Sequence, residues 1–377
     1  MKRKCFLTII CLLILVLTSC GTPTQSTTSK TPTANEPTVK KVQVIEYQES
    51  IILGEEYNEE SVKVEAVFSD DSSKIYSGDE LSFNYVDFDI YTLGRQTIKI
   101  RVKELNVTET ISVEVIKKSI KILMIANSFG DDTVQWVHEI GDDLGYDFTI
   151  ANLYIGGCVL STHLSNLKTN SAAYEYVSYN KTTKVWSRTP KTTIEAALGM
   201  DDWDYVSLQQ GSYDSGRAES YNTIDEIMDR VLAIKDDVEF IWNMTWAYQQ
   251  DSGHANFGIY NHDQMTMYNG IINAVQTKVV PNERFKFIVP NGTAVQNART
   301  SFIGDNLCRD VYCHLTLDFG RYIAGLTMVA TVTGADISEI NYSPNLSVGH
   351  RAIAIEAVKF ALLNPFNITE SSYTNEW

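Results

Sequence analysis

Basic residues are scarce in this sequence. The chain has 31 lysines and arginines against 47 aspartates and glutamates, which gives a formal charge of −16 at pH 7. Nucleic-acid binding requires a concentrated positive surface that neutralises phosphates. We therefore expect no nucleic-acid partner. The negative balance is compatible with an uncharged or weakly charged substrate.

Long apolar runs are also scarce, because only one occurs and it lies at the start. Lys2, Arg3 and Lys4 form a basic beginning, and residues 5–17 are almost entirely apolar. This run is too short to span a bilayer comfortably, so it predicts the core of a signal peptide rather than a transmembrane helix. No other segment of the sequence is expected to cross a membrane.

The sequence LTSC at residues 17–20 resembles the lipobox of bacterial lipoproteins. In that family the cysteine is acylated and the chain is cleaved directly before it. The resemblance implies a signal peptide over residues 1–19 and a lipid anchor on Cys20. Two or more acyl chains hold a protein stably on a membrane, so we expect the extracellular face of a bacterial cell envelope. The alternative is an ordinary signal peptide that contains a cysteine. Cleavage would remove three basic residues and no acidic one, changing the formal charge from −16 to −19.

Cysteines are few. Of six in the chain, cleavage and acylation would leave Cys158, Cys308 and Cys313. An odd count argues against a disulfide framework. The sequence does not decide whether Cys308 and Cys313 form a bridge.

A metal site is an alternative use for these thiols. Its candidate ligands would be Cys158, His163, Cys308, Cys313 and His314. The Cys-x₄-Cys-His spacing of the last three is not a recognised zinc pattern. We therefore expect no metal and no other cofactor.

Residues 21–40 have hardly any apolar side chains and are rich in Thr, Ser and Pro. Such a segment cannot offset its ordering entropy by burial, so residues 20–40 are predicted to be a lipid-anchored, disordered tether.

Residues 41–118 show a period of two. Apolar and polar residues alternate in VQVIEY, SVKVEAVFS, QTIKIRV and TISVEVI, which predicts a small all-β sandwich. The sequence YTLGRQTIKI at residues 91–100 resembles bacterial immunoglobulin-like domains. Glycan or cell-wall binding and a plain spacer are both compatible with this domain. We favour the spacer because no aromatic cluster or charged patch is evident.

Residues 119–377 alternate between strands and helices. We expect a helix over residues 133–144 and apolar strands at residues 122–126, 148–155, 205–208, 240–244 and 285–289. Buried strands separated by helices predict an α/β fold in which a parallel, doubly wound sheet has helices on both faces. Ligands bind such sheets at the carboxyl ends of the strands, so the residues directly after each strand are candidates for a site.

The first two expected strands are followed by residues suited to nucleophilic catalysis. Ser128 lies at the turn from strand to helix, where its hydroxyl is exposed and the helix N–H groups are close. Its alternative role is to cap the helix. The second strand ends in YIGGC, and the N–H of Gly157 could stabilise an oxyanion. The alternative is a simple tight turn.

The third and fourth expected strands are followed by polar and aromatic residues. Gln209 and Gln210 are not needed for packing, so an amide there could donate to developing negative charge, or both could belong to a polar loop. Trp246 and Tyr248 are the candidates for stacking on a sugar, whereas Trp242 is expected in the core.

The six histidines include one well-placed candidate base, His314. Histidine suits this role because its ordinary pKa lies near neutrality. A carboxylate such as Asp310 can fix its tautomer and stabilise the imidazolium. The other five are expected on helix surfaces or in a polar loop: His138, His163, His254, His262 and His350.

Taken in order, these blocks resemble the SGNH (GDSL-like) hydrolase superfamily of esterases and lipases. The resemblance spans about residues 120–366, and ANSF, YIGGC, WDYVSLQQGS, MTWAYQQ, PNGTAVQNAR and RDVYCHLTLDFGRYIAG are similar to an uncharacterised branch of secreted bacterial proteins. It implies a three-layer α/β/α, flavodoxin-like fold. The roles it implies are the nucleophile Ser128, the base His314 with its partner Asp310, and oxyanion donors at Ser128, Gly157 and Gln210 or Gln209.

The sequence departs from the superfamily pattern in three places. The usual Gly-Asp-Ser is Ala-Asn-Ser, and the asparagine of the third block is a glutamine, as in carbohydrate-acetylesterase relatives. The usual Asp-x-x-His is Asp-x-x-x-His, with Cys313 where the histidine would fall. Either the loop bulges by one residue, or a backbone carbonyl orients His314 in place of Asp310.

The sequence therefore predicts a monomeric serine esterase that removes acyl groups, in particular acetyl groups, from an extracellular glycan or another small ester. The alternative is a surface lipoprotein that binds glycan without hydrolysis through a degenerate site. The glycan assignment rests on the expected anchor, the aromatic residues and the glutamine block. The acyl group and the glycan are not defined by the sequence.

Overall fold

The computed structural model describes residues 37–375. The predicted signal peptide, Cys20 and most of the predicted tether lie outside the described residues. Strand β1 begins at Val39, two residues before the start expected for the β-rich region. Within residues 37–375, no helix combines the length and apolar character needed to cross a membrane.

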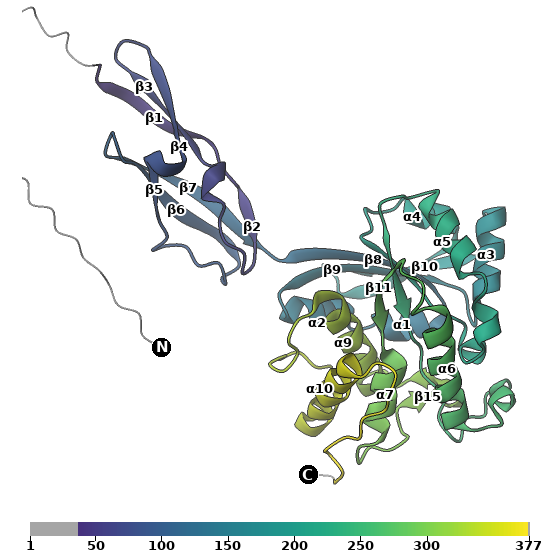
Figure 1. Ribbon diagram of the computed structural model, residues 1–377. Coiled ribbons are helices and arrows are strands. Elements are labelled where there is room, and N and C mark those ends of the chain that lie inside the picture. Colours follow the sequence, from purple (N-terminus) through teal and green to yellow (C-terminus); the bar gives the residue numbers. More distant parts are fainter. Residues whose placement is uncertain (1–36, 376–377) are drawn as a thin grey trace, which may run out of the picture. The chain divides into compact units, whose positions relative to one another are not determined.

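The β-rich region contains seven strands in two sheets (Figure 1). The three-stranded sheet has the order β1-β3-β4 and is formed by β1 (Val39–Glu46), β3 (Lys63–Phe68) and β4 (Ser73–Ser77). The four-stranded sheet has the order β2-β7-β6-β5 and is formed by β2 (Ser50–Ile52), β5 (Leu81–Asn84), β6 (Gly94–Val102) and β7 (Val107–Ile116). Every second residue is buried along the later parts of β6 and β7, so the predicted strands are confirmed. The immunoglobulin-like classification stays a prediction.

The described residues from 118 onward are built on a seven-stranded sheet of order β11-β10-β9-β8-β12-β13-β14. Its strands are β8 (Lys118–Ala126), β9 (Tyr146–Tyr154), β10 (Tyr174–Asn180), β11 (Val185–Thr192), β12 (Tyr205–Leu208), β13 (Glu239–Asn243) and β14 (Phe285–Val289). The five strands from β9 to β14 in this order are parallel to one another. The predicted parallel sheet is thus confirmed, with the strand order of a flavodoxin-like sheet.

The hairpin of β10 and β11 was not predicted. Strand β10 pairs antiparallel with β9, and β11 pairs antiparallel with β10, so the hairpin extends the sheet beyond β9. Their sequences are mostly polar, and β11 is exposed at all but two of its positions. The apolar runs that predicted the buried parallel strands are therefore missing here, because an edge hairpin is not covered on both faces.

Helices cover both faces of the sheet (Figure 1). One layer consists of helices that contact α9: α1 (Ser128–Val134), α2 (Val137–Asp143), α7 (Asn291–Arg299), α9 itself (Phe319–Thr333) and α10 (Val348–Leu363). The other consists of α3 (Leu160–Thr169), α4 (Ile194–Leu198), α5 (Ile224–Leu232) and α6 (Gln264–Lys278). The single helix expected over residues 133–144 is instead two helices, and the first begins earlier, at Ser128.

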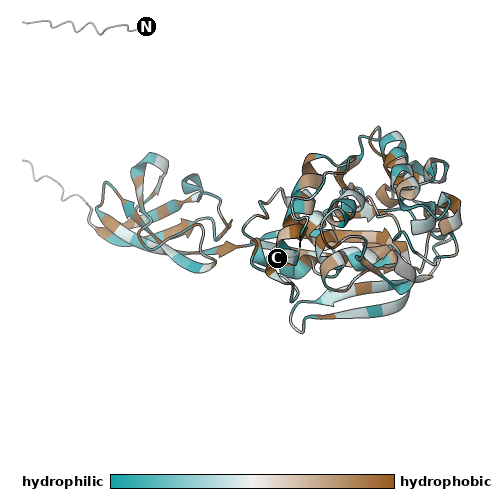
Figure 2. Ribbon diagram, turned by 90° about the horizontal axis from the view of Figure 1, so that it is seen from below, coloured by the Kyte–Doolittle hydropathy of each residue, from teal (hydrophilic) through white to brown (hydrophobic). Residues whose placement is uncertain are grey.

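The main hydrophobic core lies between the sheet and these two layers. Residues 122–126 of β8 are completely buried, since β8 has a neighbour on each side and helices on both faces. Hydrophobic residues dominate the central strands in Figure 2. This burial makes the sheet a rigid base for the loops at its carboxyl ends.

One close contact in this core gives a stability prediction. Gly141 of α2 faces Phe148 of β9, and an added Cβ at Gly141 would overlap the Phe148 ring. Gly141→Ala should therefore lower the free energy of unfolding by about 1–3 kcal/mol, the usual effect of overpacking a core. Gly199→Ala is the matched control, because its Cβ would meet nothing closer than 3.6 Å. Equal unfolding midpoints in urea for the two variants would contradict the prediction.

Candidate active site

Ser128 is the first residue of α1 and follows directly after β8 and Asn127. Its Oγ lies 2.9 Å from Nε2 of His314. The Asn127 side chain caps the helix by accepting a hydrogen bond of 2.9 Å from the N–H of Phe129. The first N–H groups of a helix have no intrahelical acceptor. The structure thus brings together the predicted nucleophile, the predicted base and an unused backbone donor.

Aromatic packing holds His314 in place. His314 begins the short strand β16 (His314–Leu315), which pairs with β15 (Cys308–Arg309). Its ring packs edge-on against Phe129, and Phe129 stacks on Trp246 at 4.2 Å between ring centres. The indole N–H of Trp246 donates to the carbonyl of Cys313 at 2.8 Å. The nucleophile's helix and the base are therefore fixed against the same buried indole.

This packing corrects the predicted roles of two aromatic residues. Trp246 and Tyr248 are completely buried. The Tyr248 hydroxyl lies 2.8 Å from that of Ser212, and its ring packs against His254. Neither ring offers a free face to a sugar, so neither can stack on a glycan as predicted.

The environment of His314 favours its neutral form. Burial lowers its pKa below the ordinary value of 6.5, and the positive charges of Arg309 and Arg321 lower it further. The carboxylate of Asp310 acts in the opposite direction. A neutral imidazole can accept a proton, which is what a general base requires.

Asp310 does not form the expected hydrogen bond with His314. Its carboxylate pairs with the guanidinium of Arg309, and its side chain is 57% exposed. The atom near Nδ1 of His314 is Sγ of Cys313, at 3.8 Å. The extra residue between Asp310 and His314 is absorbed by the single turn α8 (Asp310–Cys313), which places Cys313 beside the ring. The bulge that would keep Asp310 on His314 is thus not observed, because the extra residue lies in a helical turn and Asp310 pairs with Arg309 instead.

Asp132 is a buried carboxylate that the sequence did not reveal. It lies on α1, and its Oδ2 accepts a hydrogen bond of 2.9 Å from the N–H of Leu315, the residue after His314. Its Oδ1 lies 2.7 Å from the guanidinium of Arg321. Burial raises the pKa of Asp132 to about 6, and Arg321 opposes this shift. Its spacing from Ser128, one helical turn, is the only signal in the sequence that could have indicated it.

The predicted glycine turn is present after β9. The N–H of Cys158 donates to the carbonyl of Ile155 at 3.1 Å, and Gly157 has a φ of +64°. A left-handed conformation of this kind favours glycine. The carbonyl of Cys158 accepts a hydrogen bond of 3.0 Å from Nδ2 of Asn127. The turn is therefore tied to the residue that precedes Ser128.

The two glutamines have different surroundings. The Gln210 amide donates to the carbonyl and hydroxyl of Ser220, at 3.0 and 2.8 Å. Its oxygen accepts from the N–H groups of Leu160 and Gly211. The Gln209 amide donates to Oδ1 of Asn127 at 2.9 Å and has a second N–H. The amide with spare donor capacity is thus that of Gln209.

The structure also corrects the surroundings of several histidines. His163 is completely buried, and its Nδ1 lies 2.8 Å from the Tyr174 hydroxyl. Burial lowers the pKa of both His163 and His138 to about 3. His254 is half-buried and contributes to lowering the pKa of His314. The sequence did not indicate that the rings of His138, His163 and His254 are buried or half-buried, because their neighbours along the chain include many polar residues.

The three cysteines of the α/β part are buried, and the bridge between Cys308 and Cys313 that the sequence left open is not formed. Among residues 37–375, Cys158, Cys308 and Cys313 are free cysteines, and no group of three or more His, Cys, Asp or Glu side chains could hold a metal ion. Burial raises the pKa of these thiols to about 12, 11 and 12, respectively.

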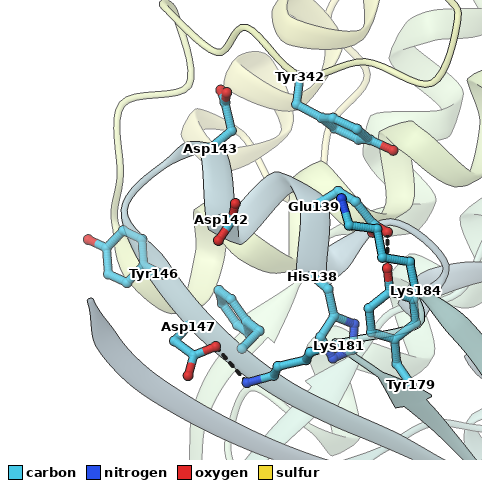
Figure 3. A pocket seen from close by; sticks show the side chains of 11 residues that line it. His138, Glu139, Asp142, Asp143, Tyr146, Asp147, Tyr179, Lys181, Lys184 and Tyr342 are labelled. Carbon is cyan, nitrogen blue, oxygen red and sulfur yellow. Dashed lines mark hydrogen bonds and ion pairs between the residues drawn. The ribbon is translucent and has the colours of Figure 1, made fainter. Parts of the chain in front are cut away.

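A separate cavity of about 390 Å³ lies beside the beginning of β9 (Figure 3). His138 and Glu139 from α2 line it together with Lys181 and Lys184 from the β10–β11 turn. The Tyr179 hydroxyl, also in its wall, donates to Glu139. Gly157 follows the other end of β9, so this cavity is not part of the Ser128–His314 site.

Comparisons with known proteins agree on a family. A family described as "Domain of unknown function (DUF4886)" matches residues 121–360. A crystal structure of a DUF4886 family protein from Bacteroides uniformis ATCC 8492 is 38% identical, covers 68% of this chain and 100% of its own, and has a TM-score of 0.64. No functionally curated protein matches the sequence.

Two carbohydrate esterases are more distant. The family 3 carbohydrate esterase of Clostridium thermocellum is 13% identical over 46% of this chain and 78% of its own, with a TM-score of 0.28. A carbohydrate esterase family 3 structure from Talaromyces cellulolyticus is 12% identical over 56% of this chain and 94% of its own, with a TM-score of 0.33. Likenesses this low carry no conclusion about activity.

The exposed position of Asp310 gives a prediction about rate and pH. Loss of a carboxylate that orients a catalytic histidine lowers the reaction rate by about 10⁴-fold. Asp310 does not contact the His314 ring, so we expect the reaction rate of Asp310→Asn to stay within about tenfold of the wild-type rate. Asparagine also tolerates the left-handed conformation of this residue, whose φ is +44°.

The reaction rate with a serine-reactive fluorophosphonate should rise with pH through a midpoint below 6.5, the ordinary pKa of histidine. Asp310→Asn should move this midpoint lower, since the carboxylate stabilises the imidazolium. A loss near 10⁴-fold would show that Asp310 orients His314, and a midpoint that moves upward would contradict the stabilisation of the imidazolium by Asp310.

Proposed function

The chain belongs to the DUF4886 family, and we propose that it is a serine esterase of the SGNH type. The observation that carries the proposal is the distance of 2.9 Å between Oγ of Ser128 and Nε2 of His314. A serine hydroxyl is a weak nucleophile until an adjacent base takes its proton. The position of Ser128 between a strand and a helix N-terminus is the arrangement that such chemistry requires.

The proposed reaction has two steps. Oγ of Ser128 attacks the ester carbonyl while Nε2 of His314 takes the hydroxyl proton, and the proton then passes to the departing alcohol. Water next attacks the acyl-enzyme with His314 again acting as base, which releases the acid and restores Ser128. In both steps the oxyanion would be stabilised by the N–H groups of Ser128 and Gly157 and by the spare N–H of Gln209.

This site would operate as a dyad. Cys313, the neighbour of Nδ1 in His314, has a thiol whose pKa is raised to about 12, so it is uncharged. The imidazolium formed during attack therefore lacks a contacting carboxylate. Because the pKa of His314 is lowered, the imidazole is also a weaker base for taking the proton of Ser128. We expect modest rates, best suited to activated or small acyl esters.

For the substrate, we propose an O-acyl group, such as acetyl, on an extracellular glycan. The expected lipid anchor on Cys20 and the negative charge of the chain support a neutral, extracellular substrate. The buried positions of Trp246 and Tyr248 remove the aromatic argument for a glycan. The substrate proposal therefore depends on location more than on the site.

A glycan-binding protein without efficient turnover is the second candidate. The observation that favours it is the missing hydrogen bond between Asp310 and His314. Binding without hydrolysis would leave Ser128 and His314 in contact, so the two candidates differ in reactivity rather than in geometry.

Covalent labelling separates these candidates. A fluorophosphonate should modify purified residues 21–377 at Ser128, and the position of the adduct can be read by mass spectrometry. Ser128→Ala and His314→Ala should each lower hydrolysis of p-nitrophenyl acetate by about 10⁴-fold or more, as losses of a nucleophile or base do. An adduct at another residue would contradict the central assignment. Equal background rates in all three proteins, with glycan binding retained, would favour the binding protein.

The anchor has its own test. In a bacterial host, the full chain should sediment with membranes and take up an alkyne-labelled fatty acid, because acyl chains hold it there. Cys20→Ala should lose the label and the membrane association. Cys11→Ala is the matched control, because that cysteine lies within the predicted signal peptide. Unchanged labelling of Cys20→Ala would contradict the lipoprotein assignment.

A further inference from the structure

Buried amide side chains stand at the carboxyl ends of four parallel strands. Asn127 directly follows β8, Gln209 directly follows β12, Asn243 ends β13, and Asn291 lies just after β14. Each is at most 1% exposed. Buried amides are costly unless their hydrogen bonds are satisfied, so their place at one edge of the sheet needs a physical reason.

These amides form one continuous chain of hydrogen bonds. Nδ2 of Asn291 donates to Oδ1 of Asn243 at 2.7 Å, and Nδ2 of Asn243 donates to Oε1 of Gln209 at 2.7 Å. Nε2 of Gln209 then donates to Oδ1 of Asn127 at 2.9 Å. Every link points the same way, and hydrogen bonds aligned in this manner polarise and strengthen one another.

This chain of hydrogen bonds ends at Asn127, whose side chain contacts both backbone segments of the proposed oxyanion hole. Oδ1 of Asn127 also accepts the N–H of Phe129, which fixes the first turn of the helix that begins with Ser128. Nδ2 of Asn127 holds the carbonyl of Cys158, which fixes the turn that contains Gly157. The two backbone donors of the proposed site are thus set by a single side chain.

A side branch attaches the middle of the chain to the same helix. Nδ2 of Asn243 also donates to Oγ1 of Thr133 at 3.2 Å, and Thr133 in turn donates to the carbonyl of Phe129 at 2.9 Å. Asn243 therefore contacts α1 directly as well as through Gln209.

We propose that this chain of Asn291, Asn243, Gln209 and Asn127 is a positioning device that sets the oxyanion donors of Ser128 and Gly157. The proposal rests on the esterase function and adds residues from two further strands to its machinery. None of the hydrogen bonds of Asn243 or Asn291 involves Ser128 or His314, so they are positioning residues rather than catalytic ones.

The chain also explains the glutamine at position 209. Its amide reaches Asn127 on one side and Asn243 on the other. Asparagine, the residue expected from the superfamily pattern, would withdraw the amide by one carbon–carbon bond, about 1.5 Å. Gln209→Asn should therefore break the chain although it restores the common residue.

The main test uses Asn243→Ala with Asn297→Ala as the matched control. Asn297 is also buried, at 1% exposure, and its amide forms hydrogen bonds with the backbone of Ala357 and Thr369, neither of which bonds any of the four amides. Both variants lose a buried amide and should lose similar thermal stability. Asn243→Ala should lower kcat for p-nitrophenyl acetate by about 10²-fold with KM nearly unchanged, the cost of misplacing a reacting group by about 1 Å. Asn297→Ala should keep the wild-type kcat.

Asn291→Asp gives a second readout that a purely structural role would not move. The introduced carboxyl group can still donate to Oδ1 of Asn243 while it is protonated, whereas the ionised carboxylate cannot. Burial raises the pKa of such a carboxyl, so the group should ionise within the measured pH range. Hydrolysis of p-nitrophenyl acetate by this variant should therefore fall as pH rises. The wild type should rise with pH to a plateau, which makes the variant profile bell-shaped.

The outcomes separate the two proposals. If the wild type reacts at Ser128 and Asn243→Ala matches it in kcat, the positioning role is overturned and the esterase function stands. A plateau instead of an alkaline decline in Asn291→Asp would also overturn it. A wild type that neither reacts with fluorophosphonate nor hydrolyses the ester would overturn the function and the positioning role together.

Discussion

The carboxylate of Asp132 is the point on which the geometry of the site depends. The nucleophile and the base come from segments far apart in sequence, and Asp132 joins them by accepting the N–H of Leu315 while it pairs with Arg321. A buried ion pair of this kind adds little net stability, but removing one partner leaves an uncompensated charge. Its contribution here is to fix one arrangement: the strand that begins with His314 can lie only where α1 places it.

Around Asp132, the protein orients the proposed base, His314, by packing rather than by charge. In a triad, a carboxylate both orients the histidine and stabilises its charged form. Here Phe129, Trp246 and the carbonyl of Cys313 orient the segment, and no acidic group among the described residues contacts the ring. Orientation and charge stabilisation are thus separated. Packing orients the ring of His314, whereas its charged form is stabilised only by the more distant carboxylate of Asp310.

The sequence was sufficient for the fold where short segments are mostly apolar, as in residues 205–208 and 285–289, which match β12 and β14. It also indicated Ser128, His314 and the turn at Gly157, because strand ends carry their own local signals. It failed for Asp310, whose direction depends on how α8 absorbs one extra residue. It failed likewise for Asp132 and Asn243. Their roles arise from hydrogen bonds between distant segments, and a single sequence does not record such contacts.

The burial of Cys158, Cys308 and Cys313 has a consequence for the conditions in which the α/β part can persist. Thiols react with oxidants and disulfides as thiolates, and pKa values of about 11 to 12 keep these three protonated at neutral pH. The covalent structure of this part should therefore be the same in reducing and oxidising surroundings. This part of the protein should therefore fold without oxidative folding machinery, in a reducing compartment or in an oxidising one.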